Sequence, residues 1–394
     1  MLVCATLAPC GGGGSGSVDG GGSDASAAVD AAPTGCPRTP AAADRERVVV
    51  ISHPYDASGA KAPTYELLAL GTDGTLTQTG TTFEMGRSLD ARIHFTPDGA
   101  IGMVAQEDGT LGVFRLDGTT PTVIDSGYDA GGAFYASDVV ISADGAHAFV
   151  LDAQWRENGG GIDQLAIDCD GNLAYEGEIA PARLAYAMTL LSGTSALVAA
   201  DDIRDSTSGD TVHLVDLTGN SVIAGADAFG DDQAIVSDAT LFGTGAQYFL
   251  VADNSQFSGV DNRIAVVALG AQKLTPVQVL TPIEDPFALV AAPDGDVAIA
   301  VSGFGNAIYQ IDYTMGGDPP FSIAGELTYT GAKPQLPGKA VLIDRGSLRG
   351  MVLVAELQGI RRVRFAGGGT VEDDGVTLVG SGNEATVGSI GVQP

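Results

Sequence analysis

The stretch from Ala91 to Gly118, ARIHFTPDGAIGMVAQEDGTLGVFRLDG, constrains the fold more than any other part of the chain. Its apolar runs are short, and Pro-Asp-Gly, a polar loop and a final Asp-Gly separate them. These are the residues that tight turns between antiparallel strands require, because they accept positive φ angles or preset the turn. The stretch therefore predicts three consecutive antiparallel strands, the larger part of one blade in a repeating sheet structure.

The same pattern recurs along the chain. Glycine-containing turns between an expected first and second strand follow one another at roughly fifty residues, the period of a β-propeller blade. These turns are Asp98-Gly99, Asp144-Gly145, Gly193-Thr194, Thr244-Gly245, Asp294-Gly295 and Arg345-Gly346. The chain has 56 glycines among 394 residues, about twice the usual share, as many short strands and turns require.

The two ends of the repeat are incomplete in complementary ways. The first segment, which opens with RVVVISH, supplies a second, third and fourth strand but no first strand. The last segment, EATVGSIGV from Glu384 to Val392, resembles a first strand with nothing after it. Pairing the two segments would complete a seventh set and cover exposed strand edges. We therefore predict an all-β fold, a seven-bladed β-propeller over residues 46–394 that is closed by pairing of the C-terminal strand with the N-terminal blade.

Charge excludes one class of partner. The chain has 49 acidic and 19 basic residues, a net charge of −30. Nucleic-acid binding depends on cationic contacts to phosphate, so we expect no nucleic-acid partner. The acidic residues either form a solvated surface or are partly gathered to hold Ca²⁺.

The N-terminal residues do not follow the repeat. Residues 1–9 form a short apolar, signal-like segment, and residues 10–45 have the Gly/Ser/Ala-rich composition of a disordered tether. Leu7-Ala8-Pro9-Cys10 resembles the lipobox of a bacterial lipoprotein, in which the cysteine is acylated, although Pro9 and the absence of preceding basic residues depart from that pattern. We expect an exported protein, either a cell-envelope lipoprotein anchored through Cys10 or a secreted protein. A chance apolar start is the remaining alternative.

Two cysteines remain beyond the tether's start, Cys36 and Cys169. Outside the cytoplasm such a pair forms a disulfide where geometry allows, and the bond would join the tether to a blade. Two unpaired thiols are the alternative. No cysteine or histidine spacing suggests zinc.

Two repeats carry a family resemblance. Residues 96–118, TPDGAIGMVAQEDGTLGVFRLDG, and residues 292–313, APDGDVAIAVSGFGNAIYQIDY, resemble repeats of the YVTN/lactonase-like β-propeller superfamily, within the wider WD40/YVTN repeat-like group. The resemblance implies seven blades. It does not imply one activity, because the superfamily includes lactonases and surface-layer proteins.

In propellers of this kind ligands meet the face built by the loops after the second strands. Those loops are long in four of the blades and rich in Asp, Asn and Gly, which favours binding there. The candidate ligand-binding residues at this face are His53, Trp155, Asp202, Asn254 and Glu356. Of the four histidines, only His53, at the start of a candidate mouth loop, is a candidate to be tested as a base.

The expected innermost strands carry a second polar set. Aligned by their turns, they place Arg92, Asp138, Ala187, Asp238, Ala288 and Lys339 at one level, with Glu384 near the equivalent position. The candidate ligands for Ca²⁺ or another divalent cation are Asp138, Asp152, Asp201, Asp238 and Asp253. The alternative is a hydrated channel in which Arg92 and Lys339 balance Asp138 and Asp238.

Two functions follow from these patterns. The first is an envelope-tethered binding or scaffold module, a monomer that grips a protein, glycan or small-molecule ligand and meets a membrane only through a lipid anchor. The second is a metal-dependent, lactonase-like hydrolase with an acidic site at the channel mouth.

Overall fold

The computed structural model describes residues 35–132, 134–153, 160–181, 185–192, 195–200, 210–230, 234–243, 247–254 and 262–394. The fold reported below is that of the unit Pro33–Pro394. The described part contains no helix that is both long enough and apolar enough to span a bilayer.

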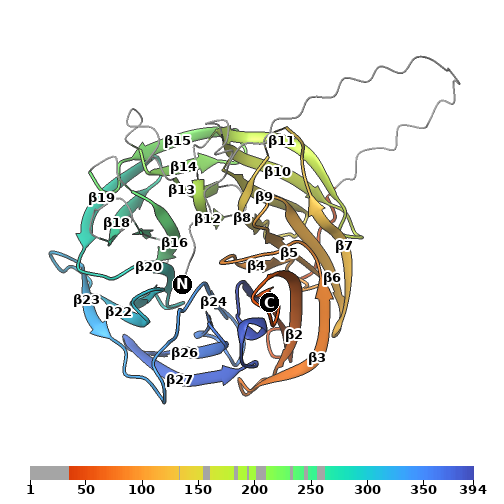
Figure 1. The fold of residues 1–394 in the computed structure, drawn as a ribbon. Helices are drawn as coiled ribbons and strands as arrows, with labels where there is room; N and C mark the ends of the chain where they lie inside the picture. Colours follow the sequence, from red (N-terminus) through yellow and green to blue (C-terminus); the bar gives the residue numbers. More distant parts are fainter. Residues whose placement is uncertain are drawn as a thin grey trace, which may run out of the picture. The chain divides into compact units, whose positions relative to one another are not determined.

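The described strands form seven four-stranded antiparallel sheets (Figure 1). From the inner to the outer strand of each, the first three sheets are β28(Ile390–Val392), β1(Arg47–Tyr55), β2(Lys61–Leu70), β3(Leu76–Glu84); β4(Ile93–Phe95), β5(Ile101–Ala105), β6(Leu111–Asp117), β7(Thr120–Tyr128); and β8(Ala136–Ile141), β9(His147–Asp152), β10(Gly161–Ile167), β11(Leu173–Pro181). The other four are β12(Ala185–Ser192), β13(Ser195–Ala200), β14(Val212–Asp216), β15(Ser221–Ala226); β16(Val236–Phe242), β17(Tyr248–Asp253), β18(Arg263–Gly270), β19(Lys273–Leu280); β20(Pro286–Ala291), β21(Val297–Ser302), β22(Ala307–Tyr313), β23(Phe321–Glu326); and β24(Ala340–Leu342), β25(Met351–Glu356), β26(Gly359–Gly367), β27(Thr370–Leu378).

The inner strands lie next to one another in chain order. β4, β8, β12, β16, β20 and β24 contact one another in sequence, and β28 contacts both β24 and β4. Figure 1 shows these strands toward the middle and β3, β7, β11, β15, β19, β23 and β27 toward the outside. The prediction of an all-β propeller is confirmed.

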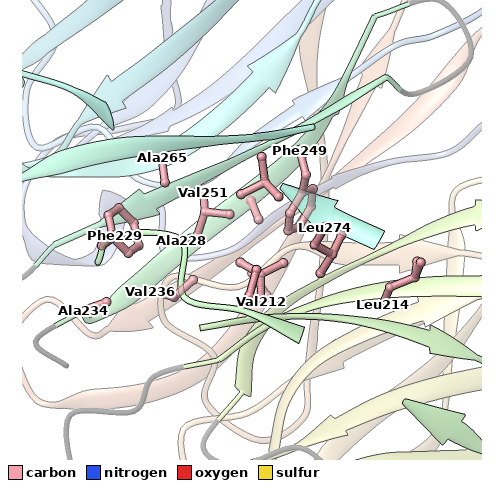
Figure 2. Packing of buried hydrophobic residues seen from close by; sticks show 14 residues of the cluster. Val212, Leu214, Ala228, Phe229, Ala234, Val236, Phe249, Val251, Ala265 and Leu274 are labelled. Carbon is pink, nitrogen blue, oxygen red and sulfur yellow. The ribbon is translucent and has the colours of Figure 1, made fainter. Parts of the chain in front are cut away.

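The core lies between neighbouring sheets. Every residue of β5, β21 and β25 is buried, because both faces of these second strands are covered. Their sequences are correspondingly continuous apolar runs, whereas the outer strand β3 is mostly exposed or half-buried. Figure 2 shows one seam, where Val212 and Leu214 of β14 and Phe249 and Val251 of β17 belong to one apolar cluster.

The C-terminal strand adds to the sheet of the N-terminal strands. Val49 pairs with Val392 and Ile51 with Ile390. The expected strand from Glu384 to Val392 is too long, because only Ile390–Val392 is extended and Asn383–Ala385 is a 3₁₀ turn. The residues before Ile390 carry the chain inward from the outer strand β27, which leaves Glu384 exposed rather than at the inner-strand level.

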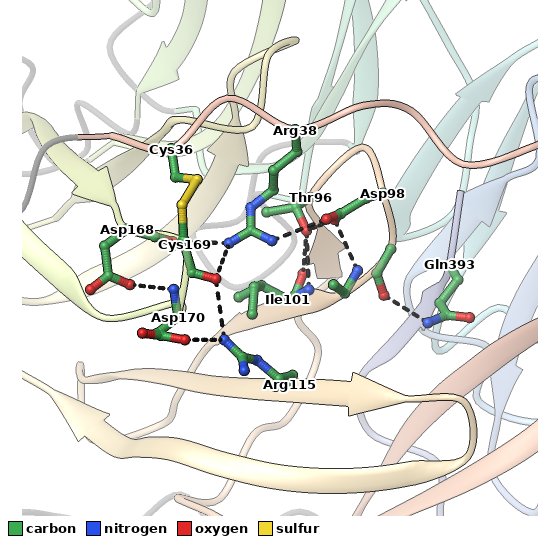
Figure 3. A network of polar contacts seen from close by, with 12 residues as sticks. Cys36, Arg38, Thr96, Asp98, Ile101, Arg115, Asp168, Cys169, Asp170 and Gln393 are labelled. Atoms are coloured by element: carbon green, nitrogen blue, oxygen red, sulfur yellow. Dashed lines mark hydrogen bonds and ion pairs between the residues drawn. A yellow bond between two sulfur atoms is a disulfide. The ribbon is translucent and has the colours of Figure 1, made fainter.

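The expected tether ends earlier than its composition indicates. Residues 35–46, here called the strap, lie along the turns of the second and third sheets, where Cys36 N donates to Ile167 O and Arg38 N to Asp144 O. Cys36 and Cys169 form a disulfide, and the Arg38 guanidinium bonds Asp98 and the carbonyl oxygens of Asp168 and Cys169 (Figure 3). The strap is therefore part of the folded unit.

Replacing Ile390 should test how much the C-terminal strand stabilises the fold. Ile390 is fully buried against Val49 and Ile51, so Ile390→Ala should lower the free energy of unfolding by about 2–5 kcal/mol. Leu378→Ala, at a side chain that is 67% exposed, should change it by less than about 0.5 kcal/mol. Urea unfolding measures the change in both variants. Equal losses in the two variants would contradict a stabilising role of the C-terminal strand.

Removing the disulfide should also destabilise the protein. Its cysteines are 133 residues apart, and a cross-link over a long loop stabilises a fold by about 2–4 kcal/mol, chiefly through the unfolded chain. The double variant Cys36→Ser/Cys169→Ser should therefore unfold at lower urea concentration than the oxidised wild type. Reduced wild type should match the double variant, and no loss in either would show that the remaining strap contacts suffice.

Candidate functional site

A repeated backbone irregularity builds the site. Four inner strands carry a β-bulge at the same place, immediately before the level of Asp138, Ala187, Asp238 and Ala288. A bulge redirects the side chain of the extra residue. The residues at the four bulges, Ser137, Tyr186, Ser237 and Phe287, all line one cavity of about 270 Å³, here called the mouth cavity.

The mouth cavity lies at the N-terminal ends of the inner strands. Its remaining polar lining residues are Asp90, Arg92, Asp138, Asp238, Asn254 and Lys339. A second cavity of about 610 Å³, here called the channel cavity, is lined by residues of all seven inner strands. Arg92 lines both cavities.

Asp238 holds Arg92 in that position. The two guanidinium nitrogens of Arg92 donate to Asp238 Oδ1 and Oδ2 at 2.6 and 2.5 Å, and Nε donates to Ala340 O at 2.9 Å. Asp238 is 1% exposed, and burial opposes its ionisation. The positive charges of Arg92 and Lys339 outweigh burial, so the pKa of Asp238 lies below its usual value. The sequence-based alternative of a charge-balanced channel is therefore supported for this pair.

Lys339 brings a second cation to the mouth cavity. Its Nζ donates to Ser237 O and to Phe287 O, and it lies 4.8 Å from the centre of the Phe287 ring. Burial lowers the pKa of Lys339, although Asp238 acts in the opposite direction. An ammonium group has three donors, so the two carbonyl bonds leave one for the cavity.

Asp90 is a carboxylate of the mouth cavity whose pKa is raised. It precedes β4 with φ of 62°, and part of its surface is exposed to solvent at the wall of the mouth cavity. Desolvation by the protein around the carboxylate raises the pKa of Asp90 to about 6, against the opposing charges of Lys339 and Arg87. Asp90 also lies close to Gly338, the residue before Lys339. A Cβ atom at Gly338 would be 3.5 Å from Asp90 Oδ1.

The candidate metal ligands on the inner strands have structural partners. Asp138 Oδ2 accepts a bond from Met188 N of the next sheet at 3.1 Å, and Asp238 Oδ2 accepts one from Leu289 N of the next sheet at 2.7 Å. The two aspartates thus perform the same task in different repeats, joining neighbouring inner strands. His94 Nε2 lies 3.7 Å from Asp138 Oδ1.

The candidates at the ends of second strands form another repeated pair. Asp152 Oδ1 accepts a bond from Tyr135 N at 2.9 Å, and Asp253 Oδ1 accepts one from Ile235 N at 2.8 Å. Arg263 also donates to Asp253. The described residues contain no group of three or more His, Cys, Asp or Glu side chains placed to hold a metal. The structure does not bring the four described aspartates together, and Asp201 lies outside the described residues.

The ligand-binding candidates separate into three groups. Asn254 lines the mouth cavity. His53 and Glu356 are buried away from it: His53 contacts Glu66 and Thr386 O through its two ring nitrogens, and Glu356 pairs with the buried Arg361. Both ring nitrogens of His53 have hydrogen-bond partners in this structure, and a role as a base stays a prediction. Trp155 and Asp202, like Cys10, lie outside the described residues.

Comparisons with known proteins reveal the fold. No family model matches the chain, and no curated protein matches its sequence. A putative 6-phosphogluconolactonase from Bacteroides uniformis is similar in structure, with a TM-score of 0.64, 12% identity and coverage of 88% of this chain and 99% of that one. A periplasmic gluconolactonase from Pseudomonas aeruginosa has a TM-score of 0.59, 14% identity and coverage of 89% and 99%.

A hypothetical selenium-binding protein from Sulfolobus tokodaii is also similar, with a TM-score of 0.64, 11% identity and coverage of 92% of this chain and 94% of that one. Proteins described as lactonases and as a selenium-binding protein thus share this architecture. The likeness establishes the β-propeller fold, and the site residues have to decide the chemistry.

Breaking the pair between Arg92 and Asp238 should be costly. Asp238→Asn leaves the Arg92 guanidinium, on a side chain that is 20% exposed, without its counter-charge, which should lower the free energy of unfolding by about 3 kcal/mol at neutral pH. Because the pKa of Asp238 is depressed in the folded state, the wild-type advantage should be present above about pH 4 and shrink as pH falls further.

Urea unfolding at a series of pH values measures this difference. Asp294→Asn is the matched control, because its partner Arg349 is exposed, and it should cause no measurable change. A pH-independent loss at Asp238 would indicate altered packing rather than a lost ion pair.

Proposed function

We propose that the mouth cavity binds a small oxygen-rich ester, a lactone in particular, and hydrolyses it. The observation that carries this proposal is the presence of Asp90, with a pKa of about 6, and Lys339 in one cavity of about 270 Å³. A carboxylate with a pKa just below neutral pH is suited to general base catalysis. An ammonium group in the same cavity is suited to stabilise an oxyanion.

The proposed reaction needs water and the lactone alone. Asp90 takes a proton from water as the water oxygen bonds to the carbonyl carbon, and Lys339 stabilises the resulting oxyanion. The tetrahedral intermediate then collapses and the ring C–O bond breaks. Asp90 returns the proton to the leaving alkoxide, and the product is a hydroxy acid.

A metal-dependent form of this hydrolase has less support. The described carboxylates of the predicted Ca²⁺ site are engaged by backbone N–H groups and arginines, so their lone pairs already serve the fold. A role as a binding module uses the same cavity without turnover. It differs in one observable, a bound ligand that is recovered unchanged.

We further propose a closed, seven-bladed ring in an exported protein. Seven sheets and the pairing of β28 with β1 support the closed ring. The disulfide between Cys36 and Cys169 supports export, because such bonds persist in oxidising compartments. Acylation of Cys10 remains a prediction, which labelling with a fatty acid and the Cys10→Ser variant would test.

Lactone hydrolysis should depend on pH through Asp90. The base acts only when deprotonated, so kcat/KM should rise about tenfold per pH unit below pH 6 and level off above pH 7. Asp90→Asn, in which an asparagine accepts the same positive φ, should abolish this rise and most of the activity. Acid release from D-glucono-1,5-lactone, corrected for spontaneous hydrolysis, is the measurement.

Asp170→Asn is the control, since the side chain of Asp170 is 79% exposed in a turn of the third sheet. It should keep both the rate and the pH profile. Unchanged hydrolysis in Asp90→Asn would disprove the assignment of the base.

A further inference from the structure

The channel cavity, which the proposed reaction does not use, has the size of a ligand site. Its volume is about 610 Å³, within the range of small-molecule pockets in proteins. Gly243 and Pro293, which lie in turns after inner strands, line it together with the terminal Pro394. The cavity therefore reaches the turn end of the inner strands, which is the end opposite the mouth cavity.

Polar side chains line the channel cavity near the level of Arg92. The side chains of Arg92 and His94 are 20% and 26% exposed, so both have accessible surface, and both line the cavity. Aligned by their turns, Thr189 and Thr240 occupy the position of His94 in their own strands, and both are half-buried lining residues. Guanidinium, imidazole and hydroxyl groups all donate hydrogen bonds, so this level suits a hydrogen-bond acceptor.

The next position along the inner strands is apolar. Its half-buried lining residues come from five different sheets and are Phe95, Ile141, Leu190, Leu241 and Leu342. Half-buried apolar side chains are stabilised when the apolar surface of a ligand removes them from water. The cavity thus offers hydrogen-bond donors at the level of His94 and apolar surface one position nearer to the turns.

The charges near the polar level favour an acceptor with a single negative charge. Arg92 donates to Asp238 and to Ala340 O through three of its five N–H groups, so it retains donor capacity. His94 Nε2 lies 3.7 Å from Asp138 Oδ1. The two carboxylates offset much of the positive charge, and they would repel a dianion such as a phosphate monoester more strongly than a carboxylate.

We infer that the channel cavity is a second ligand site, which binds a carboxylate with an unbranched apolar tail. The carboxylate accepts hydrogen bonds at the level of Arg92 and His94, and the tail lies along the apolar side chains toward the turns. The site goes beyond the proposed function and does not depend on it, because neither His94 nor Leu241 lines the mouth cavity.

Calorimetric titration at pH 7 with butanoate, hexanoate and octanoate tests the tail and the charge. Each added methylene that becomes buried should tighten binding about fourfold. The alcohol 1-octanol, which has the same tail without the charge, should bind about tenfold more weakly than octanoate. A Kd that does not fall with chain length, equal binding of 1-octanol, or no binding of octanoate would overturn the inference.

Two variants test where the ligand lies. His94→Leu should weaken octanoate binding about tenfold and leave 1-octanol binding nearly unchanged, because it removes a donor to the carboxylate. Leu241→Gln should weaken the binding of both ligands, because it reduces the apolar surface around the tail. Circular dichroism checks that each variant is folded, and if one is not, the other decides.

His147→Leu is the matched control. His147 also lies near a carboxylate, with Nε2 3.5 Å from Glu176 Oε2, and its side chain is 31% exposed. It lines neither the channel cavity nor the mouth cavity, so the variant should bind octanoate as wild type does. An unchanged Kd for octanoate in both His94→Leu and Leu241→Gln would place the ligand elsewhere and overturn the inference.

Discussion

The ion pair between Arg92 and Asp238 is the interaction on which the centre of the molecule depends. Arg92 precedes β4 and Asp238 lies on β16, so the pair joins two sheets that are not neighbours. The same aspartate accepts a backbone bond from Leu289 in the next sheet. One buried carboxylate thus fixes the spacing of three inner strands. Its partner Arg92 lines both the mouth cavity and the channel cavity.

The electrostatics of the mouth cavity follow from that pair. Asp238 favours the charged form of Lys339, and Lys339 in turn favours the charged form of Asp90. Burial opposes both effects and wins, so the pKa of Lys339 is lowered and that of Asp90 is raised. The chain has a net charge of −30, yet two of its 19 basic residues lie in this one cavity. Cations that are scarce elsewhere are used here to hold carboxylates in place.

The sequence predicted the fold well because each repeat carries local signals. Turn glycines with positive φ, such as Gly99 and Gly145, and apolar second strands are visible in any one repeat. The placement of Arg92, Asp138, Asp238 and Lys339 at equivalent positions of their repeats was also predictable. It follows from aligning the inner strands of the repeats by the turns that come after them. The length of the C-terminal strand was less predictable. Nothing in the sequence Glu384–Val392 indicates how many residues are needed to lead the chain from the outer strand β27 to the inner strand β28.

The site was only partly predictable, for two physical reasons. Acidic residues at repeated positions resemble a ligand set, but Asp138 and Asp238, like Asp152 and Asp253, satisfy backbone N–H groups that the fold leaves free. Whether a carboxylate serves the backbone or a ligand depends on distances that a sequence does not contain. Asp90 was missed because it lies in a connection, and its raised pKa comes from surrounding protein. The bulges beside Tyr186 and Phe287 carry no residue signature either.

The strap and the mouth cavity lie at opposite ends of the inner strands. The strap contacts Pro97, Asp144 and Gly346, which belong to turns after the inner strands end, whereas the mouth cavity lies where these strands begin. Cross-linking the strap through Cys36 and Cys169 therefore strengthens one end of the repeat without covering the other. This separation lets the same short strands serve two needs. Their C-terminal ends are held by backbone hydrogen bonds to the strap, and their N-terminal ends place bulges and a carboxylate of raised pKa at the mouth cavity.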